Sequence, residues 1–268
     1  MSPRRPHRDI NEPLLSSPPT RPFRQEVLLA FLYPLQLRGI LVVAACTLLM
    51  IFGAALLEAS WEDLLEFHLR SVRLVIPGLV LITFLVYCFF DVIQSSAGGR
   101  PAFPKILFNP EFDWLESYLY GIEGVVISYL PTLGFLLVTA GTTSGVNTVL
   151  LAVFRALGCL YLPMALLSLA VWRDFAAISP EIVFPLMRKV PGPTALAAAL
   201  LWIATEVHVR SVAVMLGGVY VGVYAVGAGH VVAVYLYFVT ARIIGITHWT
   251  YRNEIDWFPD VRPRPKEE

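Results

Sequence analysis

The sequence predicts an all-α integral membrane protein, a helical bundle with about six transmembrane helices and interfacial amphipathic helices. First, 57% of the 268 residues are hydrophobic and only 15% are charged, whereas soluble domains carry about 25% charged residues. Second, apolar blocks recur along the chain, each close to the about 20 residues that cross a bilayer. Third, the apolar run 194–246 is too long for one crossing and has a Gly217-Gly218 pair near its middle. We therefore interpret this run as a transmembrane hairpin.

A polar tail precedes the first apolar segment. Residues 1–24 contain five arginines and six prolines without hydrophobic periodicity, a composition typical of disorder. The segment 25–38 has apolar residues at helical spacing and charges at both ends. It predicts a short amphipathic helix on the inner membrane surface, kinked or ended by Pro34. The transmembrane domain is expected over 25–246, and residues 247–268 are expected to form a second cytoplasmic tail.

Six segments are predicted to cross the membrane, namely about 39–57, 74–90, 121–140, 149–172, 194–216 and 219–242. Asp91 is expected at the end of a helix, where solvation is easy. The connector 92–121 ends in an aromatic, acidic stretch around Trp114 that suits a helix in the headgroup layer. Pro131 is expected to kink the third crossing. The connector 173–193 predicts a loop with a short helix.

The distribution of lysine and arginine predicts that both termini lie in the cytoplasm. With six crossings, 16 of the 20 basic residues fall on the inner side, two fall on the outer side, and Arg155 and Arg210 fall within the membrane. A chain with five crossings is the alternative, and it would place the basic residues from Arg242 onward outside. The positive-inside rule therefore favours six crossings.

Five ionisable side chains inside the crossings are candidate site residues. Arg155 is expected to snorkel or to pair with an acid on another helix, and contact with a substrate or ion is the alternative. Glu206 and Arg210 are four residues apart with the acid first, which favours an ion pair within one helix. A proton or cation relay through Glu206, His208 and His230 is a further alternative. A shifted boundary that leaves Glu206, His208 and Arg210 in an outer loop is another. A buried His230 is more typical of a hydrogen-bonded core residue.

A stripe of small residues marks one face of the last crossing and includes one G-x-x-x-G pattern. Small residues let a second helix approach closely, either within the bundle or in self-association. The stripe comprises Gly218, Gly222, Ala225, Gly229 and Ala233. The three cysteines lie inside apolar blocks without the spacing of a metal site, so we expect them to be small buried hydrophobic residues.

Catalytic and cofactor motifs are missing from the sequence. It contains no H-E-x-x-H, no G-x-S-x-G and no glycine-rich phosphate loop, and its zero net charge gives no field that would attract nucleic acid. We therefore expect a non-enzymatic membrane component without cofactor or metal, which packs with lipid, with other membrane proteins or as a homo-oligomer. A small transporter or channel is the alternative, and it would need the intramembrane polar groups to converge on a cavity.

Short motifs resemble an uncharacterised bacterial family of polytopic membrane proteins. These motifs are Phe31-Leu32-Tyr33-Pro34-Leu35, the loop Ser95–Pro104 with Pro110-Glu111-Phe112-Asp113-Trp114, and Arg242-Ile243-Ile244-Gly245 with Tyr251-Arg252. The resemblance covers most of the chain and implies a bacterial cytoplasmic membrane, with no catalytic role. The architecture is also similar to Yip1-type helical bundles, which is an analogy of fold alone.

Overall fold

The computed structural model describes residues 21–65, 84–104, 114–139, 145–216, 223–252 and 254–255. All regular elements in these ranges are helices, which confirms the all-helical class. A helix Phe84–Ala97 follows the first two long elements. The labelled elements are α1 (Phe23–Leu32), η1 (Tyr33–Leu35), α2 (Leu37–Leu65), α4 (Trp114–Val138), α5 (Gly145–Trp172), η3 (Phe175–Ile178), α6 (Pro180–Lys189), α7 (Pro191–Leu216) and α8 (Val223–Tyr251).

Four helices in the described part of the chain are long and apolar enough to cross a membrane: Ser117–Val138, Val149–Trp172, Pro191–Val212 and Gly227–Tyr251. Phe23–Leu35 and Leu37–Gly53 qualify only as a pair bent by 66°, which would give five crossings if the pair is one span. Most of the predicted crossing 74–90 lies outside the described residues. Six crossings therefore stay a prediction.

Two boundaries differ from those expected from the sequence. α4 is continuous from Trp114 to Val138, so the part of the aromatic stretch from Trp114 onward belongs to the same helix as the candidate span Ser117–Val138. Pro131 lies inside α4, and the kink expected there stays a prediction. α8 continues past Arg242 to Tyr251. The continuation is stabilised by burial, because the residues that follow Arg242 pack into the core of the bundle.

Asp91 also departs from the expectation of a solvated helix end. It lies inside the helix Phe84–Ala97 and is only 8% exposed. The helix continues because Val92 and Ile93, which follow Asp91 directly, are fully buried. A charged residue that ends an apolar run is therefore not a helix boundary at this position.

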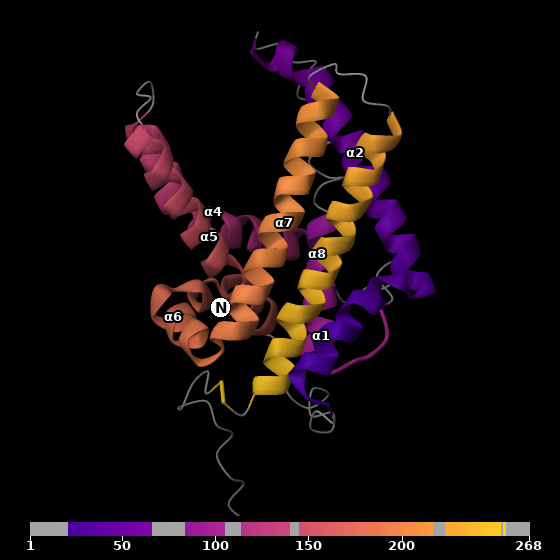
Figure 1. Ribbon diagram of the computed structural model, residues 1–268, viewed down its shortest axis with the longest axis vertical. Coiled ribbons are helices and arrows are strands. Elements are labelled where there is room, and N and C mark those ends of the chain that lie inside the picture. Colours follow the sequence, from indigo (N-terminus) through magenta and orange to yellow (C-terminus); the bar gives the residue numbers. More distant parts are fainter. Residues whose placement is uncertain are drawn as a thin grey trace, which may run out of the picture.

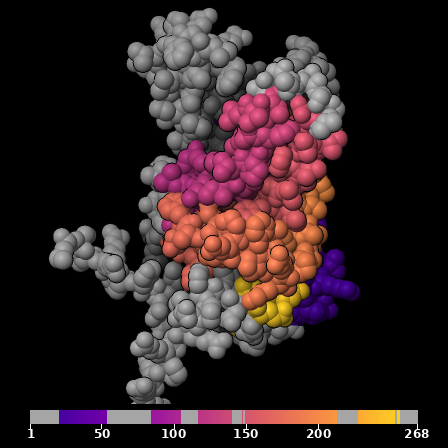
Figure 2. Space-filling view, turned by 90° about the vertical axis from the view of Figure 1, so that its left-hand side faces the viewer, coloured from indigo at the N-terminus to yellow at the C-terminus, as the bar shows by residue number. Residues whose placement is uncertain are grey.

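The helices form two antiparallel pairs (Figure 1). α7 and α8 pack along the long axis of the molecule, and α4 and α5 form a second pair that leans away from them. α2 and α1 both contact α8, while α1, α6 and the last turns of α8 lie at one end of the molecule. In the space-filling view of Figure 2, α4 and α5 make up the upper part of the face, above α6 and α7.

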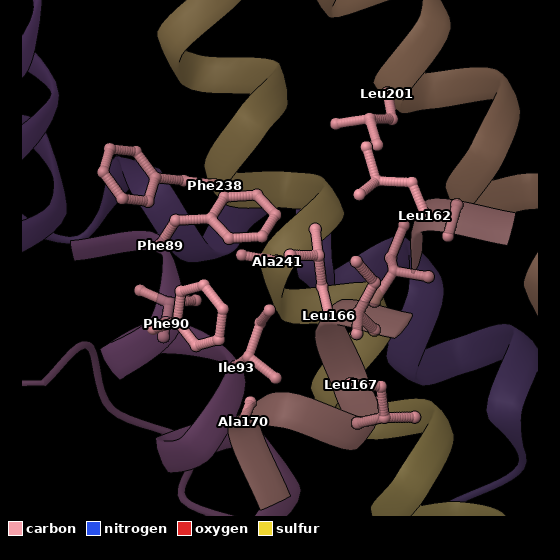
Figure 3. Close-up of a cluster of buried hydrophobic side chains, with 14 of the residues drawn as sticks. Phe89, Phe90, Ile93, Leu162, Leu166, Leu167, Ala170, Leu201, Phe238 and Ala241 are labelled. Atoms are coloured by element: carbon pink, nitrogen blue, oxygen red, sulfur yellow. The ribbon is translucent and has the colours of Figure 1, made fainter. Parts of the chain in front are cut away.

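The hydrophobic core lies where α5, α7, α8 and the helix Phe84–Ala97 meet (Figure 3). Side chains from all four helices are buried there, among them Phe89, Phe90, Ile93, Leu162, Leu166, Leu167, Ala170, Leu201, Phe238 and Ala241. In contrast, α4 exposes Leu133, Leu137 and Val138 near its end. Large exposed apolar surfaces of this kind suit contact with lipid or with another membrane protein.

Gly245 of α8 approaches the helix Phe84–Ala97 closely. A Cβ atom added to Gly245 would lie 2.3 Å from the Cβ of Ser96 and 2.5 Å from the carbonyl oxygen of Ile93. Because the second contact is with backbone, we expect Gly245→Ala to lower the free energy of unfolding by about 1–3 kcal/mol. Gly227→Ala in the same helix is the matched control, since its Cβ would meet nothing within 4 Å. Chemical unfolding in detergent micelles compares the two variants, and equal effects would contradict close packing at Gly245.

Candidate functional site

The predicted polar residues form contacts on both sides of α7. Arg155 of α5 donates a hydrogen bond to the carboxylate of Glu206 on α7. Nε of Arg210, one turn further along α7, lies 3.9 Å from Oε2 of the same carboxylate. The Arg155 guanidinium also lies 4.6 Å from the centroid of the Trp202 ring. We call Arg155, Glu206 and Arg210 the charged trio; with one acid and two arginines, its formal net charge is +1.

The charged trio lies at the periphery of the bundle and not in its core. The exposed fractions of the side chains are 41% for Arg155, 27% for Glu206 and 82% for Arg210. Arg155 and Glu206 each lie six residues inside a candidate span, which corresponds to about 9 Å along a helix. Arg210 lies only two residues inside its span, so its long side chain can reach the polar boundary. Pairing matters more for Arg155 and Glu206 than for Arg210, because an unpaired charge inside a membrane costs about 2.5–3.5 kcal/mol.

Two histidines meet on the other side of α7. The Nδ1 atoms of His208 and His230 are 3.3 Å apart, and their ring centroids are 5.1 Å apart. His230 is fully buried and lies two turns from the start of α8. Tyr237 is a further neighbour, with its ring centroid 6.5 Å from that of His208 and its hydroxyl 3.5 Å from Oγ1 of Thr205. If one Nδ1 carries the proton, the two neutral rings form one hydrogen bond.

The helical geometry of α7 separates these two contacts. Glu206 and His208 are two residues apart, which places their side chains about 200° apart around the helix. Glu206 therefore faces α5, while His208 faces α8. The structure brings the five candidate residues into two helix–helix contacts, each of which joins a different neighbour to α7.

The small-residue stripe packs inside the bundle where it can be described. A Cβ atom added to Gly229 would lie 2.0 Å from Oγ of Ser211 on α7, and Ala233 is fully buried. Gly218, Gly222 and the side chain of Ala225 lie outside the described part of the structure. At Gly229 the stripe thus serves contact between α7 and α8.

The cysteines follow the sequence-based expectation. Cys46, Cys88 and Cys159 are free and buried, and the Cys159 thiol donates to the carbonyl oxygen of Ala198. Among the described residues, no group of three or more histidines, cysteines and acids could hold a metal ion.

A second polar cluster was not predicted from the sequence. Arg242 of α8 is only 6% exposed; its Nη1 donates to Oγ of Ser96 at 3.1 Å and to the carbonyl oxygen of Arg100 at 2.6 Å. Its Nη2 lies 3.9 Å from Oε2 of Glu26, and its guanidinium lies 4.6 Å from the centroid of the Tyr33 ring. We call these five residues the Arg242 clamp, which joins α1, the loop after Ala97 and α8.

Further hydrogen bonds support the clamp. Gln36 accepts from the backbone N–H of Phe103 at 2.9 Å and donates to the carbonyl oxygen of Pro101 at 3.2 Å. The hydroxyl of Tyr235 on α8 donates to the carbonyl oxygen of Phe31. These contacts join residues far apart in the chain, so hydropathy and spacing gave no signal for them. The only local sign was one arginine, Arg242, at the end of a long apolar run.

A double-mutant cycle tests the pairing of Arg155 with Glu206. We expect Arg155→Gln and Glu206→Gln to be non-additive, with a coupling free energy of about 1–2 kcal/mol, because the two groups share one hydrogen bond between α5 and α7. The free energies of unfolding of the variants in detergent micelles give the coupling. The matched cycle of Arg210 with Glu206 should give less than about 1 kcal/mol, since Arg210 is mostly exposed. Additive effects in the first cycle would contradict the contact.

No family model, curated protein or solved structure matches this chain. The resemblance to bacterial polytopic membrane proteins and to Yip1-type bundles therefore stays a prediction.

Proposed function

We propose that this chain is a non-enzymatic component of the cell membrane, with six crossings and both termini in the cytoplasm, that works by packing against lipid and other membrane proteins. The observation that carries this proposal is the local pairing of the polar residues. The acid Glu206 contacts two arginines, and Nδ1 of His208 lies within hydrogen-bond distance of Nδ1 of His230. A solute pathway instead needs such groups to line one connected site, whereas these contacts face opposite sides of α7.

The orientation is supported by the exposed basic residues. The end of the molecule that holds α1 and α6 (Figure 1) exposes Arg21, Arg24, Arg38, Arg188 and Lys189. The stretches 139–144 and 217–222, which follow α4 and α7 in the sequence, contain no lysine or arginine. The last turns of α4 and α7 lie away from α1 and α6 (Figure 1). This asymmetry supports a cytoplasmic location for the α1 and α6 end.

We place a contact with another membrane helix on the face of α5 and α7 that carries the charged trio. Ile203, about one turn before Glu206 on α7, is an exposed apolar residue on this face. The trio has one positive charge more than its single acid can balance, and a carboxylate on the partner would neutralise it. Helices in membranes associate through van der Waals packing together with interhelical polar contacts.

A photo-crosslinking experiment tests this proposal. A photoreactive amino acid at Ile203, in the full chain in native membranes, should crosslink to one defined protein or to a second copy. Arg210→Glu should abolish this adduct, because it reverses the charge that the partner meets. Arg188→Glu on α6 is the matched control and should leave the adduct unchanged. Adducts to lipid alone, or an adduct that survives Arg210→Glu, would overturn the proposal.

A transporter or channel is the second candidate, favoured by the contact between half-buried His208 and buried His230. Two facing imidazoles inside candidate spans can pass a proton. Purified protein in liposomes with a pH-sensitive dye measures this directly. Proton flux above that of empty liposomes, abolished by His230→Asn, would support transport; flux equal to that of empty liposomes would exclude proton transport through this pair.

A further inference from the structure

The segment 21–41 bends around the end of α8 and turns its apolar side outward. We call this segment the N-terminal elbow; it comprises α1, η1 and the start of α2, and the two helical parts meet at 66°. Large exposed side chains follow one another along it: Leu28, Leu29, Leu32, Leu35, Leu37, Ile40 and Leu41. Figure 2 shows α1 at the edge of the molecule beside the end of α8.

The orientation of the elbow is fixed by its buried side. Glu26, its only acid, is directed inward to Arg242, and Ala30 and Tyr33 are almost completely buried. The Tyr235 hydroxyl binds the backbone of the elbow from α8. If α1 turned its leucines inward, it would break the Glu26–Arg242 contact and leave both charges unpaired. The apolar side of the elbow therefore faces outward, away from the bundle.

The exposed surface of the elbow is positively charged. Arg21, Arg24 and Arg38 are exposed, and they lie before and between the exposed leucines along the chain. Since Glu26 is buried, no exposed acid of the elbow offsets these arginines. Apolar side chains bordered by arginines are typical of a segment at the boundary between the acyl chains and anionic headgroups.

We infer that the N-terminal elbow binds anionic phospholipids of the cytoplasmic leaflet. The leucines enter the acyl region, while Arg21, Arg24 and Arg38 bind phosphate groups. Charge complementarity favours anionic lipid, because a second copy of the same surface would bring six arginines together. Exposure to water is unfavourable, because a continuous leucine surface would remain in contact with solvent. The inference rests only on the membrane placement in the proposed function and is independent of any partner at the α5 and α7 face.

Depth-dependent quenching tests the inference on the full chain. Leu32→Cys carries a fluorescent label; the native cysteines are buried. The protein is placed in vesicles of equimolar phosphatidylcholine and phosphatidylglycerol, in which only one of the two lipids is brominated. We expect brominated phosphatidylglycerol to quench the label more strongly, and we expect the preference to fall about fivefold for each of Arg24→Gln and Arg38→Gln.

The controls separate lipid selection from a general loss of charge or of folding. Arg188→Gln with Lys189→Gln on α6 removes two exposed basic residues at the same end of the molecule and should leave the preference unchanged. Arg24→Lys keeps the charge and should retain it. Equal quenching by both lipids, or quenching by aqueous iodide instead of brominated lipid, would overturn the inference. Neither result bears on the crosslink from Ile203, so the two proposals can fail separately.

Discussion

Replacing Arg242 with methionine should lower the free energy of unfolding by about 3–5 kcal/mol. Removal of one member of a buried ion pair leaves an uncompensated charge, which is strongly destabilising. Here the loss would strand Glu26, the hydroxyl of Ser96 and the carbonyl oxygen of Arg100, all of which Arg242 contacts. The expected effect is therefore larger than the effect of losing any single hydrogen bond.

To measure this loss, a denaturing detergent is titrated into the protein in a mild detergent. The change in helical circular dichroism then gives the free energy of unfolding. Arg188→Met is the matched control, because Arg188 is exposed at the same end of the molecule, and it should change the free energy of unfolding by less than about 0.5 kcal/mol. The double variant Glu26→Leu with Arg242→Met should recover part of the loss, because it removes both charges. If the single Arg242 variant were as stable as its control, the clamp would not hold α1 to α8.

The long helices could be predicted from the sequence because apolar runs of the right length are a local signal. The predicted segments 149–172 and 194–216 agree with α5 and α7 within a few residues. The spacing of Glu206 and Arg210 also predicted their contact, and an acid on another helix was one of the expected partners of Arg155. These signals need only the order of residues along one helix or the polarity of one position.

The Arg242 clamp could not be predicted in this way. Glu26 and Arg242 lie near opposite ends of the chain, and no local pattern says that two such residues meet. The amphipathic pattern of 25–38 was visible, but which side faces the bundle depends on this distant contact. The sequence predicted only an amphipathic helix on the membrane surface, and the structure shows that Glu26 is directed into the bundle and the leucines outward. A buried polar partner can thus fix an orientation that periodicity alone does not give.

Asp91 is a further residue whose surroundings depend on tertiary packing, and it makes the stability depend on pH. It lies outside the four candidate spans and beyond the predicted second crossing. Burial raises the pKa of its carboxyl from 3.8 to about 6, although the charges of Arg100 and Arg173 oppose the rise. The neighbouring polar contacts include Gln94, which donates to the carbonyl oxygen of Ala170 at 2.9 Å and accepts from Arg173 at 3.3 Å.

The sign of the pH effect follows from the raised pKa. Between about pH 4 and pH 6 the folded protein retains a proton on Asp91 that the unfolded chain has lost, so the stability falls as the pH rises through this window. A difference of about two pKa units corresponds to about 3 kcal/mol of the free energy of unfolding. The folded protein loses this amount by the time the pH exceeds about 6. Asp91→Asn cannot ionise, so its free energy of unfolding should exceed that of the wild type by more at pH 7 than at pH 4, with the increase approaching about 3 kcal/mol.

Unfolding titrations of both proteins at pH 4, 5, 6 and 7 measure this difference directly. The comparison between the two proteins cancels the contributions of other groups that titrate in the same range. Asp174→Asn is the matched control; its side chain caps η3 by accepting from the backbone N–H of Ala176 at 2.9 Å, and it is exposed. Asparagine caps a helix about as well as aspartate, so the difference between Asp174→Asn and the wild type should stay nearly constant from pH 4 to pH 7. If the difference for Asp91→Asn stayed constant from pH 4 to pH 7, burial would not raise the pKa of Asp91.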